Sequence, residues 1–179
     1  MAELFLHRLR RINRVIAIGV GLIFLMCSVL VLIDIAMRRF GTSLGGTDEI
    51  SGYVMAIGTA WGMAYALLEL SHVRIDFLRS TATAKWRAAL DLLSMFALAT
   101  VVTTIAIQCW PVLATTLKND SHANTPLETP LALVQAPWFL GWVWFSAMSW
   151  LTFLAGLVMV MRGEFKKSEA YIGVFKEVE

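Results

Sequence analysis

The sequence predicts an all-α integral membrane protein with four transmembrane helices, cytoplasmic termini and short amphipathic segments at the membrane interface. Apolar residues make up 58% of the 179-residue chain and charged residues only 16%. The apolar residues fall into four long blocks, and each is about as long as the ~20 residues that a helix needs to cross ~30 Å of hydrocarbon. The blocks cover residues 15–36, 50–68, 88–114 and 136–161. Since little sequence remains outside them, we expect one membrane domain over residues 1–179.

The basic residues lie mostly on one side of these blocks. Twelve of the fifteen Lys and Arg residues precede the first block, separate the second from the third, or follow the fourth. Arg38, Arg39 and Lys118 are the three in the other two loops. Because cytoplasmic loops carry an excess of Lys and Arg, this distribution predicts that both termini are cytoplasmic, with residues 162–179 as a tail.

The segment 1–14, which precedes the first block, is basic and has helical periodicity. Phe5, Leu9, Ile12 and Ile16 recur at spacings of four, three and four residues, and arginines occupy other faces. Two alternatives remain open: an amphipathic helix that lies in the headgroup region, or a plain extension of the first crossing.

The second block carries small residues at helical spacing. Small side chains let two helix backbones approach closely in a membrane, where bulk alone gives helices no reason to associate. The pattern therefore predicts a helix-packing interface, with a neighbour either in this chain or in another. One strip comprises Gly52, Ala56, Ala60 and Ala64, and a second pair beside it comprises Gly58 and Gly62.

Charged residues gather where the helices are expected to end. Asp34 and Arg38 are spaced for an i,i+4 ion pair at the outer end of the first helix. Thr47 or Asp48 is a suitable N-cap for the second helix. His72, Arg74 and Asp76 crowd the opposite end of that helix. Each group is interpreted either as a solvated helix boundary or as a contact with a partner.

Tryptophans and the third loop extend this description. Four tryptophans near the outer helix ends suit the interface, where amphipathic rings are favoured: Trp110, Trp138, Trp142 and Trp144. Trp61 and Trp150 fall within crossings and are expected to pack between helices. The proline-containing loop 115–135 is expected to be an ordered excursion.

Several classes of function are disfavoured. His7, His72 and His122 all lie outside the predicted crossings, so axial ligands for a transmembrane haem are missing. The sequence has neither a Cys/His zinc pattern nor a phosphate-binding glycine loop. We therefore expect no cofactor, no catalytic residues, no metal site and no nucleic-acid partner. The crossings also lack ionisable residues at mid-span, which argues against this chain alone being an ion-coupled carrier.

Taken together, the boundary motifs resemble the small membrane subunit, of the DctQ type, of tripartite ATP-independent periplasmic (TRAP) transporters. The resemblance extends from about Val15 to Val160, although Thr47 stands where the family often has an aromatic residue. The motifs that carry it are Asp34…Arg38-Arg39-Phe40, Asp48-Glu49-Ile50-Ser51, the small-residue second helix, His72-Val-Arg74-Ile-Asp76, and Thr125-Pro126-Leu…Pro130.

The resemblance implies a sodium-driven importer of an organic acid, such as a C4-dicarboxylate or a sialic acid, in a bacterial inner membrane. The implied partners are a large membrane subunit, which carries substrate and sodium, and a periplasmic substrate-binding protein, with membrane lipids around them. The small subunit would act as a scaffold and help to dock the binding protein. The resemblance assigns partner contacts on the periplasmic side to Arg38, Arg39, Asp48 and Glu49, and a cytoplasmic turn to His72, Arg74 and Asp76.

Two other classes of function stay open at this point. One is a self-associating structural membrane protein without a transport role, which would form a stable homo-oligomer. The other is a membrane enzyme or electron-transfer anchor, which would carry a chromophore.

Overall fold

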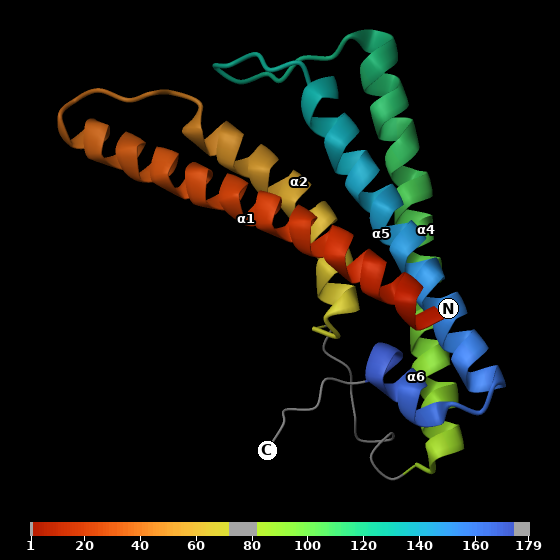
Figure 1. The fold of residues 1–179 in the computed structure, drawn as a ribbon. Helices are drawn as coiled ribbons and strands as arrows, with labels where there is room; N and C mark the ends of the chain where they lie inside the picture. The colour runs from red at the N-terminus through yellow and green to blue at the C-terminus, as the bar shows by residue number, and fades with distance from the viewer. Residues whose placement is uncertain (1, 72–81, 174–179) are drawn as a thin grey trace.

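The computed structural model describes residues 2–71 and 82–173. These form α1 (Ala2–Arg39), α2 (Thr47–Leu68), α4 (Ala84–Asn119), α5 (Ala132–Met161) and the short α6 (Phe165–Ile172). Figure 1 shows α4 and α5 side by side, α1 lying along α2, and the α1–α2 pair diverging from α5 toward the interhelical loops. We call this end, with the loops 40–46 and 120–131, the loop end.

The four long helices confirm the predicted fold class. Each of α1, α2, α4 and α5 is long and apolar enough to cross a membrane, and the described residues contain no strand. At 1.5 Å per residue, the 36 residues of α4 extend ~54 Å, well beyond the ~30 Å hydrocarbon core. The cytoplasmic placement of both termini stays a prediction.

The helix boundaries extend beyond the predicted crossings. α1 continues through residues 2–14 into the first crossing as one helix, so the basic segment has no separate element of its own. α4 begins four residues before the predicted crossing, at Ala84, and α5 begins at Ala132. The third loop is consequently shorter than expected, because residues 115–119 belong to α4 and residues 132–135 belong to α5.

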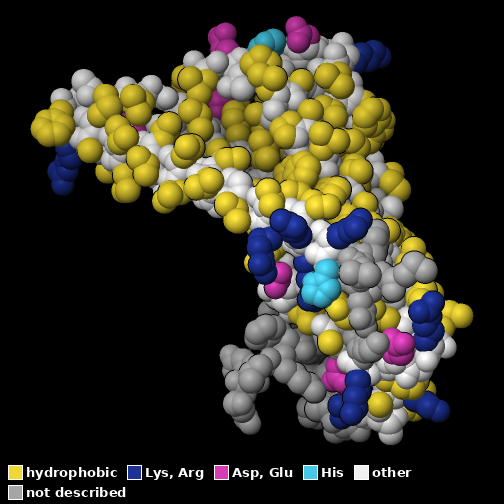
Figure 2. Space-filling view, in the orientation of Figure 1, with side chains coloured by type: hydrophobic (Ala, Val, Ile, Leu, Met, Phe, Trp, Pro, Cys, Tyr) yellow, Lys and Arg dark blue, Asp and Glu magenta, His cyan; other side chains and the backbone are white. Residues whose placement is uncertain are grey.

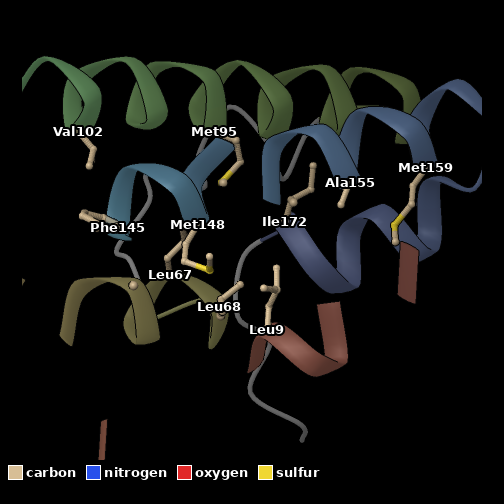
Figure 3. Packing of buried hydrophobic residues seen from close by; sticks show 11 residues of the cluster. Leu9, Leu67, Leu68, Met95, Val102, Phe145, Met148, Ala155, Met159 and Ile172 are labelled. Atoms are coloured by element: carbon tan, nitrogen blue, oxygen red, sulfur yellow. The ribbon is translucent and has the colours of Figure 1, made fainter. Parts of the chain in front are cut away.

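The hydrophobic core lies around α5, and Figure 3 shows its side chains converging from all of the described helices. Met148 and Phe145 of α5 belong to one buried cluster with residues of α4 and α2, and Ile172 of α6 packs directly against Gly156 of α5. The buried cluster consists of Leu9, Ala64, Leu67, Leu68, Met95, Val102, Phe145, Met148, Ala155, Met159 and Ile172. The short helix α6 thus closes one end of the core.

α1 differs from the other crossings because few of its side chains are buried. The most apolar 18-residue window of α1 has no buried residue, whereas 39% of the corresponding window of α5 is buried. The described side chains of α1 that are buried are Leu9, Asn13 and Asp34. α1 therefore packs along α2 through partly exposed side chains and presents an apolar surface along its length.

Candidate functional site

The loop end is organised around the Asp34 carboxylate, which is 1% exposed near the end of α1. Its Oδ1 accepts hydrogen bonds from the Leu44 backbone N–H at 2.8 Å and the Ser43 hydroxyl at 2.9 Å. Its Oδ2 accepts from the Thr47 hydroxyl at 2.8 Å and from Arg38 Nε, also at 2.8 Å. A carboxylate can accept several bonds of this kind, and bonds to a charged group are the strong ones. Asp34 therefore fixes the path of the chain from α1 into α2.

The predicted ion pair between Asp34 and Arg38 is present, with Nη2 of Arg38 2.6 Å from Oδ2 of Asp34. The predicted N-cap of α2 is wrong, however. The cap residue is Gly46, which has φ +71°, and it makes no side-chain cap bond. Thr47 lies one position inside the helix, and its hydroxyl donates to Asp34.

Glu49 connects the first turn of α2 with the third loop. Its Oε1 accepts a 2.6 Å hydrogen bond from the Tyr53 hydroxyl. The hydroxyls of Thr125 and Thr129 and the backbone amide of Leu127 also approach the Glu49 carboxylate. Oε2 is buried without a hydrogen bond of ordinary geometry to any described atom. Two motifs far apart in the sequence, at residues 48–51 and 125–130, thus meet at one corner.

A glycine allows this contact to be close. A Cβ added at Gly46 would lie 2.5 Å from both Cγ and Cδ1 of Leu127, so only a glycine leaves space for that side chain. The positive φ of Gly46 also favours glycine. Leu127 therefore sits directly against the start of α2.

The third loop is ordered by its own backbone hydrogen bonds. The N–H of Ala123 donates to the Thr129 carbonyl at 2.9 Å, and the N–H of Leu131 donates to the Ser121 carbonyl at 3.0 Å. An isolated antiparallel bridge joins His122 to Pro130. Figure 1 shows the loop reaching from α4 and α5 toward α2. At the loop end, residues of α1, α2 and the third loop are therefore held together in one ordered surface.

The four predicted partner residues at this end divide into two pairs. Arg38 and Glu49 make the contacts within the chain described above. Arg39 is exposed, and the side chain of Asp48 is 95% exposed and 3.9 Å from Arg38. Arg39 and Asp48 are thus exposed without such close contacts, whereas Arg38 combines its contacts with a side chain that is 52% exposed. The predicted turn residues His72, Arg74 and Asp76 lie outside the described residues.

The small-residue strip of α2 is also divided, into a buried half and an exposed half. Ala60 and Ala64 are buried, and Ala60 faces Gly141 of α5, where an added Cβ would lie 2.8 Å from the Ala60 Cβ. Gly52 and Ala56 are exposed, and nothing lies within 4 Å of a Cβ added at Gly52. One half of the strip therefore packs within this chain, and the other half is open.

The second small pair is divided too. Gly58 lies under the Phe24 ring of α1, whose Cζ would be 2.5 Å from an added Cβ. A Cβ added at Gly62 would meet nothing within 4 Å. The close approach of α1 to α2 therefore depends on Gly58, and Gly62 has no such role among the described contacts.

Tryptophan contacts join the helices at mid-length and were partly missed by sequence reasoning. The indole N–H of Trp61 donates to the Pro137 carbonyl at 2.9 Å, and that of Trp150 donates to the Thr103 hydroxyl at 2.9 Å. Trp144, expected near an outer helix end, instead stacks on Trp61 and donates to Oδ1 of Asn13 at 3.0 Å. Asn13 is fully buried. An uncharged polar residue among the arginines of residues 8–14 was the feature of the sequence that could have indicated this contact.

The geometry defines a four-helix membrane protein with a polar corner at one end, and the described residues contain no group of His, Cys, Asp and Glu that could hold a metal ion. Residues 27–163 match the family model described as tripartite ATP-independent periplasmic transporters, DctQ component. The match covers most of the chain, and the chain belongs to this family of small permease subunits, which is a transporter-subunit family and not an enzyme family. No curated protein and no solved structure matches the chain.

Proposed function

We propose that the chain is the small permease subunit of a sodium-driven TRAP transporter that imports an organic acid across a bacterial inner membrane. Family membership supports the class of transporter. In this proposal the chain spans the membrane four times with both termini in the cytoplasm. It scaffolds a large membrane subunit, which binds substrate and sodium, and it helps to dock a periplasmic binding protein.

The observation that carries the scaffold role is the exposed apolar surface of α1. A helix whose apolar window has no buried residue must be covered by lipid or by a partner, and Figure 2 shows hydrophobic side chains over most of the arm that α1 and α2 form. A cavity of about 360 Å³ opens on this surface, lined by Leu25, Met26, Val29, Leu30, Ile33 and Leu44. Because its lining is apolar and all of it except Leu44 belongs to α1, an apolar helix of the large subunit would fit against it.

The loop end supports the docking role. The network around Asp34 and Glu49 holds α1, α2 and the third loop in one arrangement, and a rigid surface loses less entropy on binding than a flexible one. Arg39 and Asp48 then project from this surface as two exposed charges of opposite sign. We propose that these two residues, more than Arg38 and Glu49, contact the partner subunits directly.

The test is affinity purification of the tagged chain from its native membranes, followed by identification of the co-purified proteins. A stoichiometric, highly hydrophobic partner and uptake of an organic acid that depends on sodium are the expected results. Recovery of the chain alone, or only as a homo-oligomer, would overturn the proposal and favour a self-associating structural protein.

A substitution in the α1 cavity locates the interface. Val29→Trp keeps the helix apolar but fills the cavity, so recovery of the large subunit should fall about tenfold, as for the loss of ~1.4 kcal/mol of binding energy. Val101→Trp is the matched control because Val101 is a similarly exposed valine of α4. Equal recovery of the large subunit with both variants would remove the cavity from the interface.

A substitution on the open half of the strip provides the second test. Ala56→Leu adds bulk to an exposed position of α2 and should weaken association with a partner without unfolding the chain. Ala60→Leu is unsuitable for this purpose because Ala60 packs on Gly141 within the chain. Unchanged complex yield and uptake after Ala56→Leu would show that no partner helix packs on this half.

A further inference from the structure

A basic cavity lies where the N-terminal part of α1 meets the end of α2. It has a volume of about 570 Å³ and is lined by His7, Arg8, Arg10, Arg11, Arg14 and Glu69. We call it the arginine pocket. Figure 2 shows Lys and Arg side chains, a histidine and an acidic side chain gathered near the middle of this face. The loop-end site described above does not include these residues.

The arginines of α1 are placed around the pocket because the opposite side of this helix is buried. Asn13 and Leu9 of α1 are buried, and Asn13 is tied to Trp144 of α5 by a 3.0 Å hydrogen bond. Arg10 is held with its guanidinium carbon 5.0 Å from the centre of the Tyr171 ring of α6. Because α1 is fixed to α5 and α6 at these points, its arginines have a defined placement relative to Glu69.

The pocket has a strong excess of positive charge. Among the described residues that line it, four carry a guanidinium group and one, Glu69, carries a carboxylate. Among the side chains that the structure describes, Arg8, Arg11 and Arg14 form no ion pair with a carboxylate. Guanidinium groups present planar pairs of N–H donors that match phosphate oxygens. The chemistry of the pocket is therefore that of a phosphate site.

The surface beside the pocket indicates where such a phosphate comes from. Continuing along α1, the side chains of Ile12, Val15 and Ile18 are 46%, 67% and 58% exposed. A ligand with a phosphate group and attached acyl chains would bind the arginine pocket and cover the exposed apolar side chains of α1 at the same time. Basic clusters next to a transmembrane helix attract anionic lipids in this way.

We propose that the arginine pocket binds the phosphate headgroup of an anionic phospholipid, whose acyl chains lie against the exposed apolar face of α1. The lipid adds a contact with the membrane to those that already fix this part of α1 to α5 and α6. This site rests on the pocket and on membrane insertion, and not on the identity of a transport partner.

The test is native mass spectrometry of the full chain in detergent, titrated with phosphatidylglycerol or with phosphatidylcholine as the zwitterionic control. Phosphatidylglycerol should bind tighter. Each arginine near an anionic lipid contributes about fivefold in affinity, so Arg11→Gln with Arg14→Gln should weaken phosphatidylglycerol binding about 25-fold. Lys85→Gln with Lys118→Gln is the matched control, because it removes the same charge from exposed positions outside the pocket and should leave binding unchanged.

A charge-preserving variant separates recognition from folding. Arg11→Lys with Arg14→Lys keeps the charge but loses the paired donors, so it should bind with an affinity between those of the wild type and the glutamine variant. Equal binding of the two lipids, or equal binding of phosphatidylglycerol by the wild type and both pocket variants, would overturn the proposal. Displacement of the lipid by an equal concentration of inorganic phosphate would also overturn it, in favour of a soluble anion.

Discussion

α1 and α5 are both apolar helices of membrane-spanning length, yet they are stabilised by different kinds of contact. α5 lies at the centre of the core and packs against α2, α4 and α6 along its length. α1 packs mainly along α2, with Phe24 over Gly58 and Asp34 bonded to Thr47, and it meets α5 at few places, among them the bond between Asn13 and Trp144. Apolar sequence alone therefore specifies a membrane helix without specifying what covers it. The exposed apolar surface of α1 is left for lipid or a partner to cover.

A matched pair of glycines should reveal this difference most strongly. A Cβ at Gly141 of α5 would lie 2.8 Å from Ala60 Cβ and 2.9 Å from Trp61 Cδ1, whereas a Cβ at Gly21 of α1 would meet nothing within 4 Å. Gly141→Leu should therefore destabilise the chain by about 3 kcal/mol through overpacking. Gly21→Leu should be neutral or slightly stabilising, since leucine favours helix more than glycine does. Thermal unfolding of the purified full chain in detergent measures both, and equal melting temperatures would contradict the comparison.

The next largest effect is expected where a buried polar residue anchors α1. Asp34→Ala removes the acceptor of four hydrogen bonds and leaves their donors without it, so the melting temperature should fall by roughly 5 °C. Amide exchange in residues 40–47 should accelerate as well. Asp48→Ala is the control, since Asp48 also lies near Arg38 but is exposed. A similar loss in both variants would mean that charge near Arg38, and not the Asp34 network, holds the corner.

The contact between α1 and α5 should have a smaller, pairwise effect. The Trp144 indole donates to Asn13, so Asn13→Ala and Trp144→Phe each remove one partner of the same hydrogen bond. A double-mutant cycle should give a coupling energy of about 1 kcal/mol, as for a typical protein hydrogen bond. Asn13→Ala combined with Trp150→Phe is the control pair, because Trp150 donates to Thr103 instead. A coupling near zero for Asn13 and Trp144 would mean that this contact does not hold α1.

Sequence periodicity and length were sufficient to predict the four crossings. Every crossing must make its backbone hydrogen bonds internally and must surround its backbone with apolar side chains. The Asp34–Arg38 pair was predictable for the same local reason, since i,i+4 residues adjoin on a helix. What escaped prediction depends on tertiary contact. Thr47 has the right chemistry for an N-cap, but the cap is Gly46, and the Thr47 hydroxyl donates to Asp34, thirteen residues earlier.

The candidate site shows the same limit. Glu49 and the loop 125–130 were each singled out by their own motifs, but nothing in their spacing predicted that they would meet. Likewise, four equally spaced small residues on α2 gave no sign that Ala60 and Ala64 would be buried while Gly52 and Ala56 stayed open. That division follows from the divergence of α2 from α5, which is a property of the assembled fold (Figure 1).

The smallest effect is expected at the tether between α2 and the third loop. Tyr53→Phe removes the hydroxyl that donates to Glu49 at 2.6 Å, while the approach of Thr125, Thr129 and Leu127 to the carboxylate remains. The melting temperature should therefore fall by no more than ~2 °C. The local consequence is larger, because Glu49 loses one of the groups that orient it toward the loop, and amide exchange in residues 120–131 should become several-fold faster. Tyr65→Phe on the same helix is the control and should leave exchange in the loop unchanged. If Tyr53→Phe also leaves it unchanged, the loop is held by its own backbone bonds and by Leu127 on Gly46, and Glu49 is free to serve a partner.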